Sequence, residues 1–111
     1  MNPPISIKGV LLVDGRVLLV KNPRSEWELP GGRIEDGEDH STTLSREFAE
    51  ELAVDIAVAD QIDSYLFEVI PGRHVLIITY GCRLTGEFKL NLPLGYRRSV
   101  EKWANAKIKN G

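Results

Sequence analysis

The distribution of apolar and polar positions predicts a chain built mostly of strands and interrupted by one amphipathic helix. The first two strands are near-continuous apolar runs joined by the turn signal Asp14–Gly15, so both of their faces are expected to be partly covered. The later strands alternate or are rich in β-branched and aromatic residues, and Pro71–Gly72 marks a turn between the last two. We expect strands at residues 5–13, 16–21, 27–29, 54–59, 64–70 and 74–84.

A helix is predicted over residues 41–53, between the third and fourth of these strands. Leu44, Phe48 and Leu52 recur at every fourth position and form one apolar stripe along it. This stripe predicts that the helix packs one face against the sheet.

The helix termini and a second helix are less strongly marked. Ser41 or Thr42 can cap the N-terminus of the first helix. A short second helix is expected over residues 99–109, capped by Ser99. With 111 residues, the chain suits one domain, 1–111, and the element order alone predicts an α/β fold of the α+β type.

Three carboxylates share one face of the predicted helix. Glu47, Glu50 and Glu51 are spaced i, i+3 and i+4 and fall within an arc of about 100°. Like charges at this spacing repel one another, and a hard divalent cation such as Mg²⁺ or Mn²⁺ would relieve the repulsion. A solvated acidic face is the other interpretation of such a cluster.

The loop before the helix adds two glycines and more acidic residues. Gly31 and Gly32 follow Pro30, so the backbone can turn sharply there and approach a ligand closely. Nine of the sixteen acidic residues lie between Glu35 and Asp60. Without a cation this region would repel a phosphate substrate, so the concentration of charge favours a metal site.

Charge and cysteine content exclude several classes of protein. A net charge of −2 gives no basic patch suited to duplex nucleic acid. The single cysteine, Cys82, excludes a disulfide framework and a cysteine-based zinc site. The N-terminus does not resemble a signal peptide and no apolar run approaches a membrane span, so we expect a cytoplasmic protein that binds no membrane.

Residues 32–54 resemble the Nudix box, the signature of the Nudix (MutT-related) hydrolases. The match runs from Gly32 through Glu38 to Arg46-Glu47-Phe48, Glu50-Glu51 and Val54 at the family's spacing, and residues 27–31 resemble the usual lead-in. One position departs, because Ala53 stands where the family usually has glycine. If the backbone there adopts a positive φ, Ala53 carries strain.

The resemblance implies an α/β/α sandwich with a mixed central sheet. Glu101-Lys102-Trp103 loosely resembles a Glu-x-Trp region late in Nudix domains, where a longer helix usually follows. Only eight residues follow Trp103 here. Two explanations stay open: a partner subunit completes the fold, which would make the protein a homodimer, or the helix is simply short.

The resemblance also assigns site residues. It implies that Glu47, Glu50 and Glu51 bind the metal and activate water, with the carbonyl of Gly31 as a further ligand. Glu38 would support the loop or a second shell around the metal. Arg46 and Gly32 would have structural roles, with Arg46 pairing a loop carboxylate and so fixing the loop to the helix.

The general base and the substrate contacts stay open at this point. Candidates for the base are Glu47 within the box and Glu87 and Glu101 outside it. Arg24 and Trp27 would stand near the substrate mouth together with Lys21, and Tyr65, Phe67 and Tyr80 could line a base-binding pocket. Solvated surface for the basic residues and core packing for the aromatic residues are the alternatives.

The function implied is that of a Mg²⁺-dependent hydrolase. It would cleave the pyrophosphate of a nucleoside diphosphate linked to another moiety: a nucleoside triphosphate, ADP-ribose, a nucleotide sugar or a dinucleoside polyphosphate. The alternative is a catalytically weak Nudix-fold domain that binds nucleotides or regulates. Either way, the expected partner is a nucleotide-type small molecule.

Overall fold

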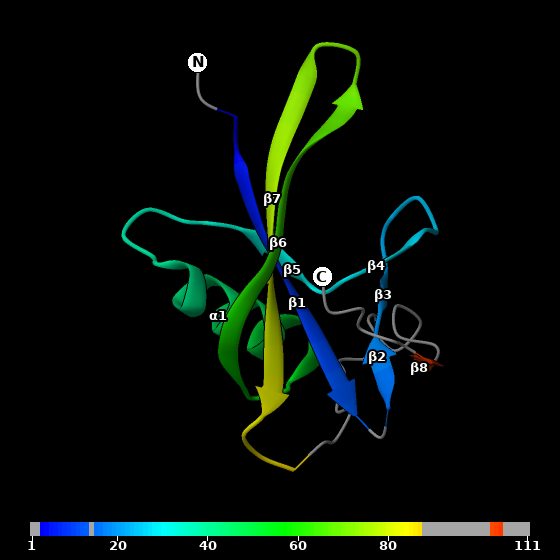
Figure 1. The fold of residues 1–111 in the computed structure, drawn as a ribbon, viewed down its shortest axis with the longest axis vertical. Helices are drawn as coiled ribbons and strands as arrows, with labels where there is room; N and C mark the ends of the chain where they lie inside the picture. The colour runs from blue at the N-terminus through cyan, green and yellow to red at the C-terminus, as the bar shows by residue number, and fades with distance from the viewer. Residues whose placement is uncertain (1–2, 14, 88–102, 106–111) are drawn as a thin grey trace.

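The computed structural model describes residues 3–13, 15–87 and 103–105. Their main feature is a mixed sheet in the order β6-β7-β1-β2-β8, in which β1 runs parallel to β7 and the other neighbours are antiparallel; β5 also pairs with β1, and β3 and β4 form a separate two-stranded sheet (Figure 1). The elements are β1 (Ile5–Val13), β2 (Arg16–Leu18), β3 (Val20–Lys21), β4 (Trp27–Glu28), β5 (Gly31–Arg33), α1 (His40–Leu52), β6 (Ile56–Ile70), β7 (Arg73–Leu84) and β8 (Trp103–Asn105).

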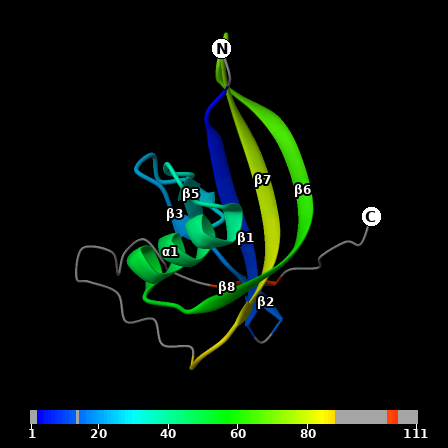
Figure 2. The ribbon, with the colours of Figure 1, turned by 90° about the vertical axis from the view of Figure 1, so that its left-hand side faces the viewer.

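The core lies between α1 and the sheet. Figure 2 shows α1 on one side of β1, β7 and β6. The predicted stripe of Leu44, Phe48 and Leu52 is fully buried and packs with Ile7 of β1 and Ile78 of β7. The mixed sheet and the helix packed on it confirm the predicted α+β fold class. Within the described residues, no helix is long and apolar enough to cross a membrane.

Several predicted strands have different bounds in the structure. The strand at 5–13 is confirmed, but the strand predicted at 16–21 divides at Leu19, because β2 pairs with β1 whereas β3 pairs with β4. The strands predicted at 54–59 and 64–70 form a single strand, β6, whose polar middle is accommodated by register shifts against β7 rather than by a loop.

The glycine-containing stretch predicted as a loop begins with a short strand. Gly31–Arg33 forms β5 and pairs antiparallel with Ser6–Lys8 of β1. Glycine has a low strand propensity, so sequence alone favoured a loop there. The strand forms because its backbone hydrogen-bonds to β1, despite the low strand propensity of its glycines.

The N-cap of α1 is Asp39, not Ser41 or Thr42 as predicted. Its carboxylate accepts a hydrogen bond from the backbone N–H of Thr42 at 2.8 Å. That hydrogen bond also lowers the pKa of Asp39. A carboxylate satisfies a free N–H group and complements the helix dipole, which a hydroxyl does less well.

The prediction of a C-terminal helix over 99–109 is wrong where it can be compared with the structure. Trp103–Asn105 form β8, which pairs antiparallel with β2. The other residues of that predicted helix lie outside the described residues. In the described part of the chain, α1 is therefore the only helix, and the second helical layer of the predicted sandwich is not observed.

The C-cap of α1 is a left-handed residue. Ala53 has φ 54° and ψ 39°, and its backbone N–H donates to the carbonyl of Ala49 at 3.0 Å. An L-residue in this conformation carries roughly 1–2 kcal/mol of strain, which glycine avoids. The strain expected from the sequence at this position is therefore present.

We predict that Ala53→Gly stabilises the protein by about 1 kcal/mol, because glycine removes the left-handed strain and thereby more than offsets its greater freedom in the unfolded chain. Thermal unfolding followed by circular dichroism would measure it. Ala49→Gly, on the exposed face of α1, is the matched control and should destabilise by about 1 kcal/mol. A lower melting temperature for Ala53→Gly than for wild type would contradict the claim that Ala53 is strained.

Candidate active site

Arg46 links the acidic loop to the helix. Its Nε and Nη2 atoms donate to the two carboxylate oxygens of Glu38 at 2.6 and 3.0 Å. Both side chains are largely buried, with 21% and 11% exposed. Nη2 also donates to the backbone carbonyl of Arg33 at 3.4 Å. The pairing that was expected between Arg46 and a loop carboxylate is thus present, in a two-point geometry that fixes orientation as well as distance.

Both carboxylate oxygens of Glu38 accept hydrogen bonds from protein donors. Beyond Arg46, it accepts from the backbone N–H of Glu35 at 3.0 Å and from the Thr43 hydroxyl at 2.9 Å. These contacts, with the Arg46 hydrogen bond first, lower its pKa to about 2. Glu38 therefore holds the loop on the helix rather than offering oxygens to a ligand.

Arg46 also holds two of the helix glutamates. Its Nη1 atom lies 3.0 Å from Glu47 and 3.3 Å from Glu50. The Glu47 side chain is 15% exposed, whereas that of Glu50 is 62% exposed. Arg46 thus fixes the position of Glu47 more firmly than that of Glu50, whose exposed pair with Arg46 is a weak one.

Two glycines allow the loop to approach the helix and the sheet. A Cβ at Gly32 would overlap the Glu47 carboxylate, and a Cβ at Gly31 would overlap the backbone carbonyl of Ile7. Gly31 also has φ 148°, which other residues rarely adopt. Both positions require glycine because other groups approach the backbone closely. The sequence suggested a ligand as the approaching group, whereas in the structure the approaching groups belong to the protein itself.

Glu51 is the carboxylate with the most perturbed protonation. Burial raises its pKa to about 8, and a hydrogen bond and charge repulsion from Glu47 act in the same direction. The positive charge of Lys8 acts in the opposite direction. Near neutral pH the protonated form of Glu51 is therefore favoured, which avoids a second negative charge beside Glu47.

These carboxylates fit a divalent cation as a pair. Among the described residues, no group of three or more histidine, cysteine, aspartate or glutamate side chains is arranged to hold a metal. Glu47 and Glu51 nevertheless offer oxygen donors, which hard cations prefer, at a half-buried place where a proton now offsets their charge. A cation that replaced this proton would compensate the negative charges of Glu47 and Glu51.

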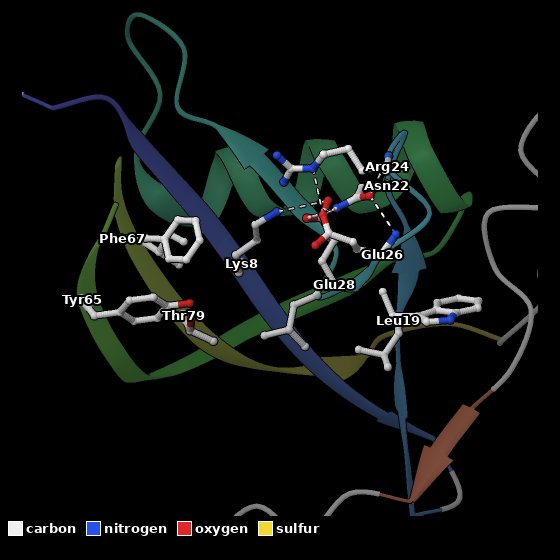
Figure 3. Close-up of a pocket in the computed structure, with 12 residues that line it drawn as sticks. Lys8, Leu19, Asn22, Arg24, Glu26, Glu28, Tyr65, Phe67 and Thr79 are labelled. Carbon is white, nitrogen blue, oxygen red and sulfur yellow. Dashed lines mark hydrogen bonds and ion pairs between the residues drawn. The ribbon is translucent and has the colours of Figure 1, made fainter. Parts of the chain in front are cut away.

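A cavity of about 430 Å³ lies on the other face of the sheet from the α1 core (Figure 3). In Figure 3, Tyr65 and Phe67 lie on one side of Lys8, and Glu28 lies on the opposite side of Lys8. The Lys8 ammonium is 3.9 Å from the Glu28 carboxylate, and both charges influence the pKa of Glu51. Two residues of the cavity lining, Lys8 and Glu28, therefore lie close enough to Glu51 for their charges to act on it. Its lining consists of Lys8, Leu19, Asn22, Arg24, Glu26, Trp27, Glu28, Leu29, Tyr65, Phe67, Ile77 and Thr79.

The structure brings together most of the residues that the sequence suggested for the substrate. Arg24, Trp27 and Tyr65 line the cavity, and Phe67 joins them. Tyr80 does not, because it lies on the helix side of the sheet and its hydroxyl is 2.6 Å from His40 Nδ1.

The other candidates are less central. Lys21 lies over the Trp27 ring, 5.6 Å from its centroid. Of the proposed bases outside the box, Glu87 is exposed and Glu101 lies outside the described residues.

Sequence reasoning missed Lys8 and Asn22. Lys8 is the one charged residue in the strand Ile5–Val13, and that interruption of an apolar run is a signal that could have identified it. The Asn22 side chain accepts from the backbone N–H groups of Arg24 and Glu26 at 2.9 and 3.0 Å, so it shapes the loop beside the cavity. An Asn before Pro in a loop gives no comparable signal of a site.

Comparisons with known proteins agree on one family. A NUDIX domain model matches residues 4–106. The chain is 35% identical over 51 residues to the 8-oxo-dGTP diphosphatase of Proteus vulgaris, covering 46% of this chain and 45% of that protein. It is 31% identical over 68 residues to the CTP pyrophosphohydrolase of Escherichia coli, covering 57% and 50%. A NUDIX-family hydrolase from Clostridium perfringens shares the fold, with a TM-score of 0.78 at 18% identity over 95% of this chain and 83% of that one.

The chain spans about half the length of the two named relatives. Their activities therefore belong to longer proteins and do not transfer by likeness alone.

We predict that the stabilising effect of Glu38 is lost in acid. A carboxylate whose pKa is lowered from 4.5 to about 2 by folding stabilises the protein above pH 4.5, and this contribution disappears as the pH falls toward 2. Glu38→Gln should therefore melt several degrees below wild type at neutral pH, and the difference should shrink across that range.

Glu35→Gln is the matched control for this pH series, because the exposed Glu35 carboxylate lies 3.6 Å from the same arginine. It should alter the melting temperature less at every pH. A difference between wild type and Glu38→Gln that stays constant from pH 7 to pH 2 would show that the ionised carboxylate is not the stabilising group.

Proposed function

The chain belongs to the NUDIX domain family, and we propose that it is a divalent-metal-dependent hydrolase that cleaves the pyrophosphate linkage of a nucleotide-type substrate. The observation that carries this proposal is the half-buried Glu47–Glu51 pair, together with a cavity of nucleotide size whose lining residues Lys8 and Glu28 act electrostatically on Glu51. Two relatives named for diphosphatase and pyrophosphohydrolase activities on nucleotides support the substrate class.

The metal proposed is Mg²⁺ or Mn²⁺. Glu51 and Glu47 are the proposed principal ligands, with Glu50 and the carbonyl of Gly31 as the further oxygen donors expected from the box. When bound, the cation would neutralise charge on the pyrophosphate and draw it to an acidic site that would otherwise repel it. Arg46 and Glu38 act here by fixing the loop on the helix, so that the oxygens of both elements stay at a constant separation.

Glu47 is the general base that we favour. It takes a proton from the attacking water, whose oxygen then forms a bond to one phosphorus while the bond to the bridging oxygen breaks and a phosphate-linked group leaves. Arg46 and the backbone of Gly32 hold this carboxylate in one position. Glu87 remains the alternative among the described candidates, and substitution distinguishes the two.

The cavity is the proposed site of the nucleoside. Tyr65, Phe67 and Trp27 offer ring faces on which a base can stack, which suits any of the bases. Lys8 and Arg24 supply positive charge within the same cavity lining, where the phosphates would lie. Base stacking and phosphate binding together would define a nucleoside diphosphate linked to another group.

A second candidate function is a Nudix-fold domain that binds nucleotides without efficient turnover. Two observations favour it: Ala53 in a strained C-cap, and the absence of a three-ligand group among the described residues. Metal binding and turnover, measured separately, discriminate the two functions.

We predict that Mg²⁺ or Mn²⁺ stabilises the folded protein through the Glu47–Glu51 pair. At about 100 times its dissociation constant a bound cation stabilises by about 2.7 kcal/mol, which raises the melting temperature by roughly 10 °C or more. Differential scanning calorimetry with and without the cation would measure this shift. Glu51→Gln should abolish it, whereas Asp55→Asn, an exposed carboxylate beyond the helix, should retain it.

The same variant provides an internal check that the fold is intact. At pH 8 in metal-free buffer, Glu51→Gln should be at least as stable as wild type, because folding raises the pKa of this carboxyl from 4.5 to about 8 and so disfavours its ionised form. Equal cation shifts in wild type and Glu51→Gln would exclude this pair as the metal site.

We predict turnover on at least one member of a panel of nucleoside triphosphates, ADP-ribose, nucleotide sugars and dinucleoside polyphosphates with Mg²⁺. Released phosphate and mononucleotide would be measured by chromatography. Glu51→Gln and Glu47→Gln should each lower kcat by roughly 10²–10⁴-fold, whereas Glu87→Gln should leave it unchanged. Metal-dependent stabilisation without turnover on any substrate would favour the binding domain, and a near-wild-type Glu47→Gln would remove Glu47 as the base.

A further inference from the structure

The outer strand β6 exposes an unusual amount of apolar side chain. It is the end strand of the described sheet, and Figure 1 shows the β6–β7 hairpin extending beyond the rest of the molecule. Six of the seven large hydrophobic side chains exposed in the described residues lie on it, each 45–55% exposed: Ile62, Tyr65, Leu66, Phe67, Val69 and Ile70. Isolated exposed apolar residues are common, but six on one strand are not.

The exposed edge of β6 contains a regular central segment. Asp63–Glu68 pairs with β7 in unbroken register, and register shifts occur only on either side of it. Edge strands usually avoid pairing with other chains through bulges, prolines or charges. In β6, the register shifts and the charges of Asp63 and Glu68 lie on either side of Tyr65, Leu66 and Phe67. These three residues contain no bulge, proline or charge.

We propose that β6 pairs antiparallel with β6 of a second copy of this chain, about a two-fold axis at Leu66. This register places Tyr65 opposite Phe67 of the partner subunit, and Leu66 opposite Leu66 of the partner subunit. It also brings Ile62 opposite Ile70 of the partner subunit. Every exposed apolar side chain of β6 except Val69 thus faces an apolar side chain of the partner subunit.

The placement of the carboxylates selects this register over its neighbours. Because opposed residues share a face of the sheet, the neighbouring registers have their axes at Tyr65 or at Phe67. An axis at Tyr65 would place Asp63 opposite Phe67 of the partner subunit, and an axis at Phe67 would place Glu68 opposite Leu66 of the partner subunit, so each would set a carboxylate directly against a large apolar side chain of residues 65–67. With the axis at Leu66, Glu68 faces Ser64 of the partner subunit instead.

The exposed area is sufficient for a second copy. Six half-exposed large side chains present on the order of 500 Å² of apolar surface per copy, at the upper end of what a monomer usually exposes. Two copies would bury on the order of 1,000 Å², which approaches the lower limit for a specific interface. An isologous interface needs one self-complementary strand, which β6 provides.

The pairing would extend the candidate site. Tyr65 and Phe67 line the cavity on one face of the hairpin. Phe67 of the partner subunit would stand beside Tyr65 on that same face, because directly opposed residues share a face of the sheet. Each cavity would then have an aromatic wall built from both copies. The dimer itself does not depend on the proposed catalytic function.

The first test is the mass in solution by sedimentation equilibrium at ~100 µM protein. Wild type should show twice the chain mass of 12.4 kDa. Leu66→Lys and Leu66→Glu should each sediment as monomers, because each places two like charges on the axis, while an equimolar mixture of the two should recover the dimer. Leu66 is exposed, so both variants should melt near the wild-type temperature. A monomeric wild type, or variants that remain dimeric, would overturn the proposal.

The second test fixes the register by cross-linking. Leu66→Cys should form an intermolecular disulfide under mild oxidation, because a residue on the axis faces itself across a separation that a disulfide spans. Ser64→Cys, which would face Glu68 of the partner subunit, is the matched control and should cross-link much less. Cys82 should not react, because burial raises the pKa of its thiol to about 12. Equal cross-linking of both variants would reject the axis at Leu66.

Discussion

The structure of the acidic region depends on one guanidinium group. Arg46 contacts Glu35, Glu38, Glu47 and Glu50, with the shortest separation, 2.6 Å, to Glu38. The pair with Glu38 is largely shielded from water, so it is both strong and costly to break from one side. Because the same cation holds a loop carboxylate and a helix carboxylate, the loop cannot move relative to α1 without separating charges. The spacing in the Nudix box is, in physical terms, the spacing that lets one arginine do this.

Arg46 compensates only part of the negative charge, and the remainder defines the candidate site. Glu51 receives no contact from Arg46, and its charge is disfavoured by burial and by Glu47. Lys8 opposes this effect from β1 but does not cancel it. The protein thus stabilises Glu38 and Glu47 through Arg46 and leaves Glu51 with its ionised form disfavoured. That division distinguishes residues that hold the loop from residues available for chemistry.

Local patterns in the sequence were enough to predict the helix and its apolar stripe, and the Nudix resemblance added the role of Arg46; all three depend on residues close together in the chain. Contacts between distant residues were not predictable in the same way. Gly31–Arg33 becomes a strand only because β1 lies beside it, and Leu19 interrupts a strand only because the chain there leaves one sheet for another. The predicted second helix failed at 103–105 for the same reason, since pairing with β2 overrides local propensity. The choice of Asp39 over Ser41 as N-cap was a competition among adjacent capping residues that sequence alone did not decide.

The strand β1 connects the cavity, the loop and the core through its alternation. Ile7 points into the core with Ile78, whereas its neighbour Lys8 lines the cavity with Thr79, and each of these pairs is in register across β1 and β7. On the other edge of β1, Ile7 and Lys8 pair with Gly32 and Gly31, the two glycines that allow close approach to Glu47 and to the backbone of Ile7, respectively. A slip of one residue in β1 would move Ile7 to the cavity and Lys8 to the core, and would displace the loop from the helix. Burial of Ile7 therefore fixes the register that places Lys8 in the cavity lining, where its charge acts on Glu51, so the energetics of the core set the geometry of the site.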